Sequence, residues 1–191
     1  MRFFRKTMLT VVCIVMAVAF ASCSAGKDPI AELANDYSGR LQERLGVSAD
    51  DVQAMDASDI PNANAYEGTF YLCTDRDMPS LDCRTYDDPD KAREEFERMY
   101  DSFNESFDED SYEGEYQCFY EDDYGYIVLD GSFPGVGIFG DVYRMGNEIY
   151  AGVYYSGNAV AVIMPRNSLS NSDVEGVISR LELPMANGNN T

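Results

Sequence analysis

Apolar side chains recur every three to four residues in three stretches of the chain, and this spacing predicts three amphipathic helices. The first two stretches, residues 28–46 and the residues from Asp88 onward, each open with Asp-Pro, in which Asp caps the helix and Pro takes its first position. The third stretch, residues 172–183, stops at Pro184. The apolar positions are Ile30, Leu33, Tyr37, Leu41 and Leu45 in the first, Ala92, Phe96, Met99, Tyr100, Phe103 and Phe107 in the second, and Val174, Val177, Ile178 and Leu181 in the third.

Short runs rich in aromatic and β-branched residues predict β-strands between these helices. Two of the runs enclose the turn-like segment 75–80 and predict a hairpin, which a short helical segment from Ser48 precedes. Gly146-Asn147 and Gly157-Asn158 separate later runs as two-residue hairpin turns. The predicted strands span residues 69–74, 81–86, 116–120, 124–129, 138–145, 148–155 and 159–164. We therefore expect an α+β fold, in which an antiparallel meander of about five to six strands is covered by helices on one face.

The first residues of the chain follow the pattern of a signal peptide. Arg2, Arg5 and Lys6 precede an apolar stretch over residues 8–21 that only Thr10 interrupts. This stretch is shorter than the run of about 20 apolar residues that a membrane-spanning helix needs. The pattern therefore predicts export of the chain rather than a spanning anchor.

The apolar stretch ends in Phe-Ala-Ser-Cys at residues 20–23, which resembles the lipobox of bacterial lipoproteins, with Phe20 where Leu is usual. The resemblance implies cleavage before Cys23, a diacylglycerol on its thiol and a fatty acyl chain such as palmitate on its new amine. An ordinary secretory signal cut after the Ala-Phe-Ala of residues 19–21 and an uncleaved anchor remain as alternatives. Both of them also export the chain.

This resemblance and the length of the chain predict its division into four parts. Residues 1–22 form the signal peptide, 23–27 the tether, 28–184 a single globular domain and 185–191 a loose tail. Two or three acyl chains hold a protein stably on a membrane, so we expect an extracytoplasmic protein of the cell envelope that is anchored to the cell membrane. The order of its elements resembles that of small uncharacterised bacterial lipoproteins of α+β type, a resemblance that implies no activity.

The charge of the chain narrows the range of its partners. Its formal net charge is −20, and removal of the signal peptide takes away three cations and no acidic residue, which leaves −23. Because the phosphates of nucleic acids are repelled by such a surface, nucleic acid is excluded as a partner. A content of 45% hydrophobic residues is sufficient for a buried core.

Three cysteines remain after the signal peptide and the lipidated residue are set aside. Cys73 and Cys83 flank the predicted hairpin turn, and a disulfide between them is the leading expectation in an oxidising compartment. A bond from either of them to Cys118, or three free thiols, are the alternatives. The absence of His and of Cys-x-x-Cys from the sequence argues against a metal site.

Two motifs that bind cofactors or metals in other proteins stand here in an unsuitable context. Residues 135–140 spell Gly-x-Gly-x-x-Gly, but a predicted strand follows them, whereas a dinucleotide site needs a helix N-terminus at the pyrophosphate. A calcium loop over residues 108–110, Glu113 and Glu115 requires Gly and Glu at its sixth and twelfth places, which hold Glu and Phe. We interpret this segment and residues 121–123 as solvated acidic loops, and predict neither a cofactor nor a metal.

The sequence lacks the catalytic residues and motifs of the common hydrolases. It has no His and no Gly-x-Ser-x-Gly, which excludes a Ser or Cys nucleophile activated by a His base. A pair of carboxylates is enough for glycoside hydrolysis, and 34 acidic residues leave such a pair open. We assign no catalytic residue and keep a carboxylate-dependent hydrolase of envelope glycans as the alternative function.

Tyrosines are concentrated in the strand-rich half of the chain. Aromatic faces beside carboxylates bind sugars or cationic peptides, and Tyr120, Tyr124, Tyr126 and Tyr154 are the candidate ligand face. The alternative is that these side chains fill a half-buried sheet. We expect a non-enzymatic acidic binding or accessory module for a cationic protein, peptide or envelope component, with a purely structural envelope module as the third hypothesis.

Overall fold

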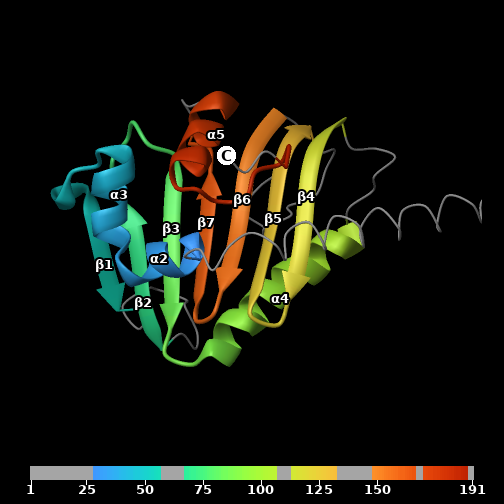
Figure 1. Cartoon of the computed structure of the whole chain (residues 1–191), viewed down its shortest axis with the longest axis horizontal. Coiled ribbons are helices and arrows are strands. Elements are labelled where there is room, and N and C mark those ends of the chain that lie inside the picture. Colours follow the sequence, from blue (N-terminus) through green and yellow to red (C-terminus); the bar gives the residue numbers. More distant parts are fainter. Residues whose placement is uncertain (1–27, 57–66, 107–112, 133–147, 167–169, 189–191) are drawn as a thin grey trace, which may run out of the picture.

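The computed structural model describes residues 28–56, 67–106, 113–132, 148–166 and 170–188. These residues form one antiparallel sheet of seven strands with helices packed on both of its faces (Figure 1). The predicted α+β fold is therefore confirmed. The sheet has more strands than the five or six expected for the meander, because the two strands of the predicted hairpin and one strand that was not predicted also belong to it.

Two antiparallel meanders make up the sheet, with the strand order β1-β2-β3-β7-β6-β5-β4. The first meander ends in β3 and the second runs from β4 to β7, and the antiparallel pair β3 and β7 joins them. The strands are β1 (Val52–Asp56), β2 (Gly68–Cys73), β3 (Ser80–Tyr86), β4 (Glu113–Glu121), β5 (Tyr124–Ser132), β6 (Glu148–Ser156) and β7 (Ala159–Met164).

The additional strand is β1, where the sequence predicted a helical segment. The helix there is only the 3-10 turn η1 (Ala49–Asp51), after which the chain extends and pairs with β2. Three of the five residues of β1 are exposed, so its sequence shows little of the apolar alternation that predicts a strand. The predicted strand 138–145 and its Gly146-Asn147 turn lie outside the described residues.

The helices are α2 (Pro29–Asn35), α3 (Tyr37–Leu45), α4 (Pro89–Ser106) and α5 (Asn171–Arg180). The predicted helix 28–46 is thus two helices that meet at Asp36, whose φ of −144° and ψ of 61° are not helical. The Asp36 side chain accepts a hydrogen bond from the amide of Gly39 and so caps α3. A short polar side chain that bonds the nearby backbone ends one helix and starts the next.

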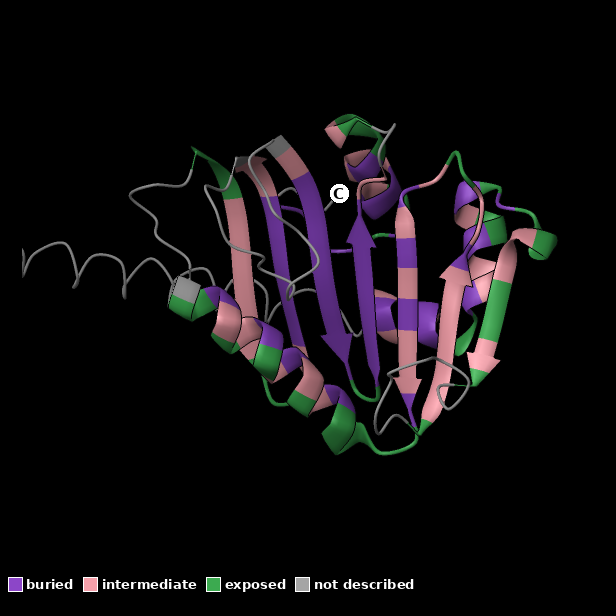
Figure 2. Cartoon of the chain, turned by 180° about the vertical axis from the view of Figure 1, so that it is seen from behind, coloured by how far each residue is buried: buried purple, intermediate pink, exposed green. Residues whose placement is uncertain are grey.

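Helices cover both faces of the sheet, which corrects the expectation that they lie on one. We call the side packed by α2, α3 and α5 the front face and the side packed by α4 the rear face. Figure 2 shows α4 crossing the rear face of the sheet, with β6 and β7 buried along most of their length. All six residues of β7, Ala-Val-Ala-Val-Ile-Met, are buried. A strand without a polar side needs a cover on each face, and that is the physical reason for the second layer.

The beginning of the C-terminal segment packs on the front face, so the predicted loose tail 185–191 is wrong for its first residues. Met185 and Ala186 are buried, and the amide of Ala186 donates to the Tyr150 hydroxyl at 3.2 Å. The hydroxyl of Tyr154 donates to the carbonyl of Pro184 at 3.0 Å. Two buried tyrosines therefore hold the segment that follows α5.

The sheet has two ends that carry different elements. At the first, which we call the Asp28 end, Asp28 caps α2 and accepts a hydrogen bond from Ser156 at the end of β6. The turn between β6 and β7 also lies there, with Gly157 at a φ of 54° as predicted for a Gly-Asn hairpin turn. The opposite end, the α5 end, carries α5 and the β2–β3 turn, because Ser80 pairs with Met164. The two ends are separated by β7, whose six residues span about 20 Å.

Candidate functional site

An open cleft of about 470 Å³ lies at the α5 end, between the β2–β3 turn and α5. We call it the α5 cleft. Its volume falls in the range of roughly 300–1,000 Å³ that is typical of small-molecule sites. Its lining residues are Asp77, Met78 and Pro79 from the turn and Ser172, Asp173, Gly176, Val177, Ser179 and Arg180 from α5.

The turn that forms one wall is held in place by its own backbone and by Arg166. The amide of Asp77 donates to the Asp75 carboxylate at 2.9 Å, which fixes the turn locally. The guanidinium of Arg166 donates to the carbonyls of Asp75 and Cys73, each at 2.6 Å. The Asp75 carbonyl also accepts a hydrogen bond from the amide of Met78 at 3.4 Å, so Arg166 and the backbone of the turn together fix the wall that carries Asp77 and Met78.

The other wall is the exposed side of α5. Ser170 and Asp173 form a capping box at the start of this helix, and the Ser170 amide donates to the carboxylate of Asp173 at 2.8 Å. These hydrogen bonds from Ser170 lower the pKa of Asp173. Val174 and Ile178 bury the opposite side of the helix in the front core. The helix therefore packs on the sheet through its apolar side, and its polar side faces the cleft.

Gly176 leaves a gap in this wall. A β-carbon built at this position meets no atom of the described residues within 4 Å. Glycine in a helix interior costs about 0.5–1 kcal/mol relative to alanine. The sequence therefore accepts a weaker helix at a lining position where a side chain would project into open space.

Opposite charges line the α5 cleft without pairing. The Nε of Arg180 donates to the carbonyl of Gly176 at 3.1 Å, but its guanidinium forms no ion pair with a carboxylate that the structure describes. The carboxylate of Asp77 likewise forms no ion pair within the described ranges, although both groups line the same cleft. Most other described cations do pair with acidic residues: Arg40, Arg44, Arg84, Lys91, Arg93 and Arg98.

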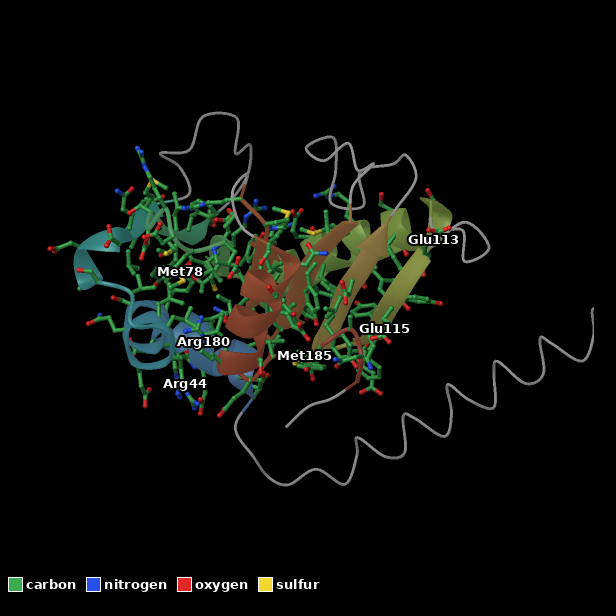
Figure 3. The ribbon with its side chains drawn as sticks, turned by 90° about the horizontal axis from the view of Figure 1, so that it is seen from above. Arg44, Met78, Glu113, Glu115, Arg180 and Met185 are labelled. Carbon is green, nitrogen blue, oxygen red and sulfur yellow. The ribbon has the colours of Figure 1, made fainter. Side chains whose placement is uncertain are left out.

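Figure 3 shows the α5 end from above, with Met78 and Arg180 side by side and Arg44 next to Arg180. Arg44 differs from its neighbour because it forms an ion pair with Glu182 at 2.8 Å. Glu113 and Glu115, part of the acidic segment considered for calcium, lie far from the cleft at the β4 edge of the sheet. The remainder of that segment, residues 108–110, and the glycine motif lie outside the described residues.

The four tyrosines predicted as a ligand face do not share a surface. Tyr154 is 0% and Tyr126 is 7% exposed, and both belong to the front core. Tyr124 is half-buried beside them, with its ring 5.9 Å from that of Tyr126. Tyr120 lies on the rear face, where it packs on Phe96 of α4 at 5.5 Å. The alternation of side chains places Tyr120 on the opposite face from the other three, and these are buried or half-buried in the front core, so the prediction of one tyrosine face is wrong.

The three described cysteines are free thiols, so the predicted disulfide between Cys73 and Cys83 is not formed. Cys83 lies opposite Tyr71 in the β2–β3 register, which leaves Cys73 in a diagonal position, farther away than a disulfide needs. Cys118 packs on the rear face, whereas the other two are in the front core. Burial raises the pKa of the Cys83 thiol to about 12, as it does for Cys118. The third alternative, three free thiols, matches the structure.

A carboxyl group with a raised pKa is present, but not at the α5 cleft. Asp82 of β3 is half-buried on the same face of the sheet as Arg84, and desolvation by burial raises its pKa. Its Oδ1 atom has no hydrogen-bond partner among the described residues. Within the described ranges, no three His, Cys, Asp or Glu side chains are grouped so that they could hold a metal ion.

Neither a protein-family model nor a curated protein nor a solved structure matches this chain. None of the helices in the described parts of the chain is both long and apolar enough to cross a membrane. The predicted lipid-bearing residue, Cys23, lies outside the described residues. The function of the chain is therefore inferred from its own residues.

No pattern in the sequence predicts the α5 cleft, because its two walls lie about 100 positions apart and share no motif. One signal was present. A glycine inside a helical pattern that is otherwise regular indicates either a cost or a place where space is needed, and Gly176 is such a residue.

Proposed function

We propose that this chain is an extracytoplasmic lipoprotein, anchored to the cell membrane through Cys23, whose domain is a non-enzymatic binding module with its ligand site in the α5 cleft. The observation that carries this proposal is the position of the cleft. It lies at the opposite end of the sheet from Asp28, where the described chain begins.

In this proposal the short tether between Cys23 and Asp28 determines how the cleft is oriented relative to the membrane. Cys23 precedes Asp28 by five residues, which span at most about 18 Å when fully extended. Asp28 is itself fixed, because it caps α2 and bonds Ser156. A lipid on Cys23 thus keeps the Asp28 end near the membrane surface and leaves the α5 cleft on the side that faces away from it. A ligand that arrives from outside the membrane meets the cleft first.

The chemistry of the cleft supports binding rather than glycan hydrolysis. A glycosidase needs a carboxylic acid whose raised pKa lets it donate a proton. In the α5 cleft the pKa of Asp173 is lowered by Ser170, and the acid with a raised pKa, Asp82, is on β3 outside the cleft lining. The unpaired charges of Asp77 and Arg180 also favour a ligand site over a purely structural module.

The lipid anchor is tested by detergent phase partitioning of the full chain. Replacement of the lipid-bearing residue, Cys23→Ala, is expected to move the protein from the detergent phase to the aqueous phase or to leave an uncleaved precursor of higher mass. The matched control is Cys13→Ala, which removes a thiol from the signal segment and keeps the lipobox. Equal partitioning and equal mass of all three proteins would reject the anchor and with it the proposed orientation.

A further inference from the structure

The groups that line the α5 cleft define the charge pattern of a ligand. Asp77 and Asp173 contribute two carboxylates, and Arg180 contributes one guanidinium. One oxygen of Asp173, Oδ2, accepts the hydrogen bonds from Ser170, which leaves Oδ1. Met78, which is half-buried, supplies apolar surface beside these charges, and Val177 behind it is only 1% exposed. The complement of this lining has two cationic groups, one carboxylate and an aliphatic stem.

We propose that the α5 cleft binds a free basic amino acid, a molecule of the lysine, ornithine or arginine type. This inference rests on the proposed binding function and names its ligand class. The terminal nitrogens of Arg180 bind the ligand carboxylate in the bidentate manner that a guanidinium favours. Asp77 and Asp173 take the two cationic groups, and the methylene stem lies on Met78.

Binding of such a ligand is favoured because charged side chains on the two walls of the cleft form no ion pair with each other. Asp77 and Arg180 line one cleft yet form no ion pair with each other, so a ligand that carries both signs of charge bonds each of them without breaking an existing pair. The strongly negative protein also draws cations towards itself. A ligand with a net positive charge therefore gains both from the pattern of the cleft and from the field of the whole chain.

Other classes of small molecule fit this lining less well. A diamine satisfies the two carboxylates but leaves the guanidinium of Arg180 without a partner. A neutral aliphatic amino acid satisfies Arg180 and one carboxylate only. An acidic amino acid brings a second negative group against Asp77 or Asp173. Each of these molecules lacks or misplaces one charge, which makes a comparison among them informative.

The ligand class is tested by calorimetric titration of the full lipoprotein in detergent micelles. L-lysine and L-arginine are expected to bind at least tenfold more tightly than L-norleucine, which lacks the side-chain cation, and than cadaverine, which lacks the carboxylate. Equal affinity for lysine, norleucine and cadaverine would overturn the proposal. So would the absence of saturation by both lysine and arginine in protein whose circular dichroism shows it to be folded.

Matched variants locate the binding. Arg180→Gln is expected to weaken lysine at least tenfold and cadaverine by less than twofold, whereas Arg44→Gln, which removes a neighbouring guanidinium already paired with Glu182, changes neither. Gly176→Leu fills the gap in the wall and abolishes binding, whereas Gly176→Ala, which adds only a methyl group, retains it. Lysine binding that survives Gly176→Leu would overturn the assignment to this cleft.

The failure of this inference is distinguishable from the failure of the proposed function. If lysine and arginine do not bind but another molecule raises the melting temperature of the wild type and not of Gly176→Leu, the ligand class is wrong and the α5 cleft remains a binding site. If Cys23→Ala does not change partitioning, the anchor is wrong, whatever the titrations show.

Discussion

The two ends of the sheet differ in how completely their polar groups are satisfied. At the Asp28 end, Asp28 caps α2 and accepts from Ser156, and the hydroxyl of Tyr155 donates to the Asp122 carbonyl at 2.9 Å. At the α5 end, Asp77 and Arg180 line an open cleft without an ion pair to a described partner. Buried or partly buried polar groups that are bonded to each other stabilise a fold. Charges held apart beside open space are instead available to a ligand, so we propose a structural role for the first end and ligand binding at the second.

The comparison predicts that loss of one carboxylate has a large effect on stability at the Asp28 end and a small effect at the α5 end. Asp28→Ala removes the cap from the amides of Ile30 and Ala31 and the partner of Ser156, and is expected to lower the free energy of unfolding by about 1–2 kcal/mol. Asp77→Ala is the matched control and is expected to change it by less than about 0.5 kcal/mol. Urea unfolding followed by circular dichroism measures both, and equal losses would remove the distinction between the ends.

A smaller effect tests the cost of the desolvated carboxylate of Asp82 in β3, one oxygen of which has no hydrogen-bond partner among the described residues. Burial raises the pKa of Asp82, so its folded state favours the protonated form, and its contribution to stability is present at acidic pH and is lost as the pH rises through the raised pKa. Asp82→Asn is therefore expected to stabilise the protein at pH 7 by about 1 kcal/mol, and by less near pH 4. Urea midpoints at the two pH values check this, with Asp77→Asn as the exposed control. A gain that is larger at pH 4 than at pH 7 would contradict the assignment.

Much of this fold can be predicted from the sequence, wherever apolar residues keep a regular spacing over several helical turns or neighbouring strands. The apolar stripe of α4, with Phe96 and Phe103, predicts a helix, and the Gly157-Asn158 turn predicts the β6–β7 hairpin. Both features are local, because one residue type at one spacing is enough to specify them. The strand β1 was missed because it depends on its pairing with β2, a tertiary contact that overrides a weak local preference. The break at Asp36 is local, but an Asp inside a regular apolar spacing does not by itself show that it caps a new helix.

The candidate site was much harder to predict than the fold. The tyrosines were grouped by their nearness in sequence, but Tyr120 and Tyr124 project to opposite faces of the sheet. The pairing of Cys73 with Cys83 failed for a related reason, because the register of the hairpin places them diagonally. The α5 cleft joins a turn and a helix through the pairing of β3 with β7, a contact that no local pattern encodes.

The most direct test of the account is the accessibility of the two ends on right-side-out membrane vesicles. Ser172→Cys, at the α5 cleft, and Asp123→Cys, at the Asp28 end, each place a thiol at an exposed position of a protein whose described native thiols have raised pKa values. A bulky membrane-impermeant maleimide is expected to label Ser172→Cys as fast on vesicles as in detergent, and Asp123→Cys several-fold more slowly on vesicles. Equal labelling of both variants on vesicles, or faster labelling of Asp123→Cys, would contradict the claim that the cleft faces away from the membrane.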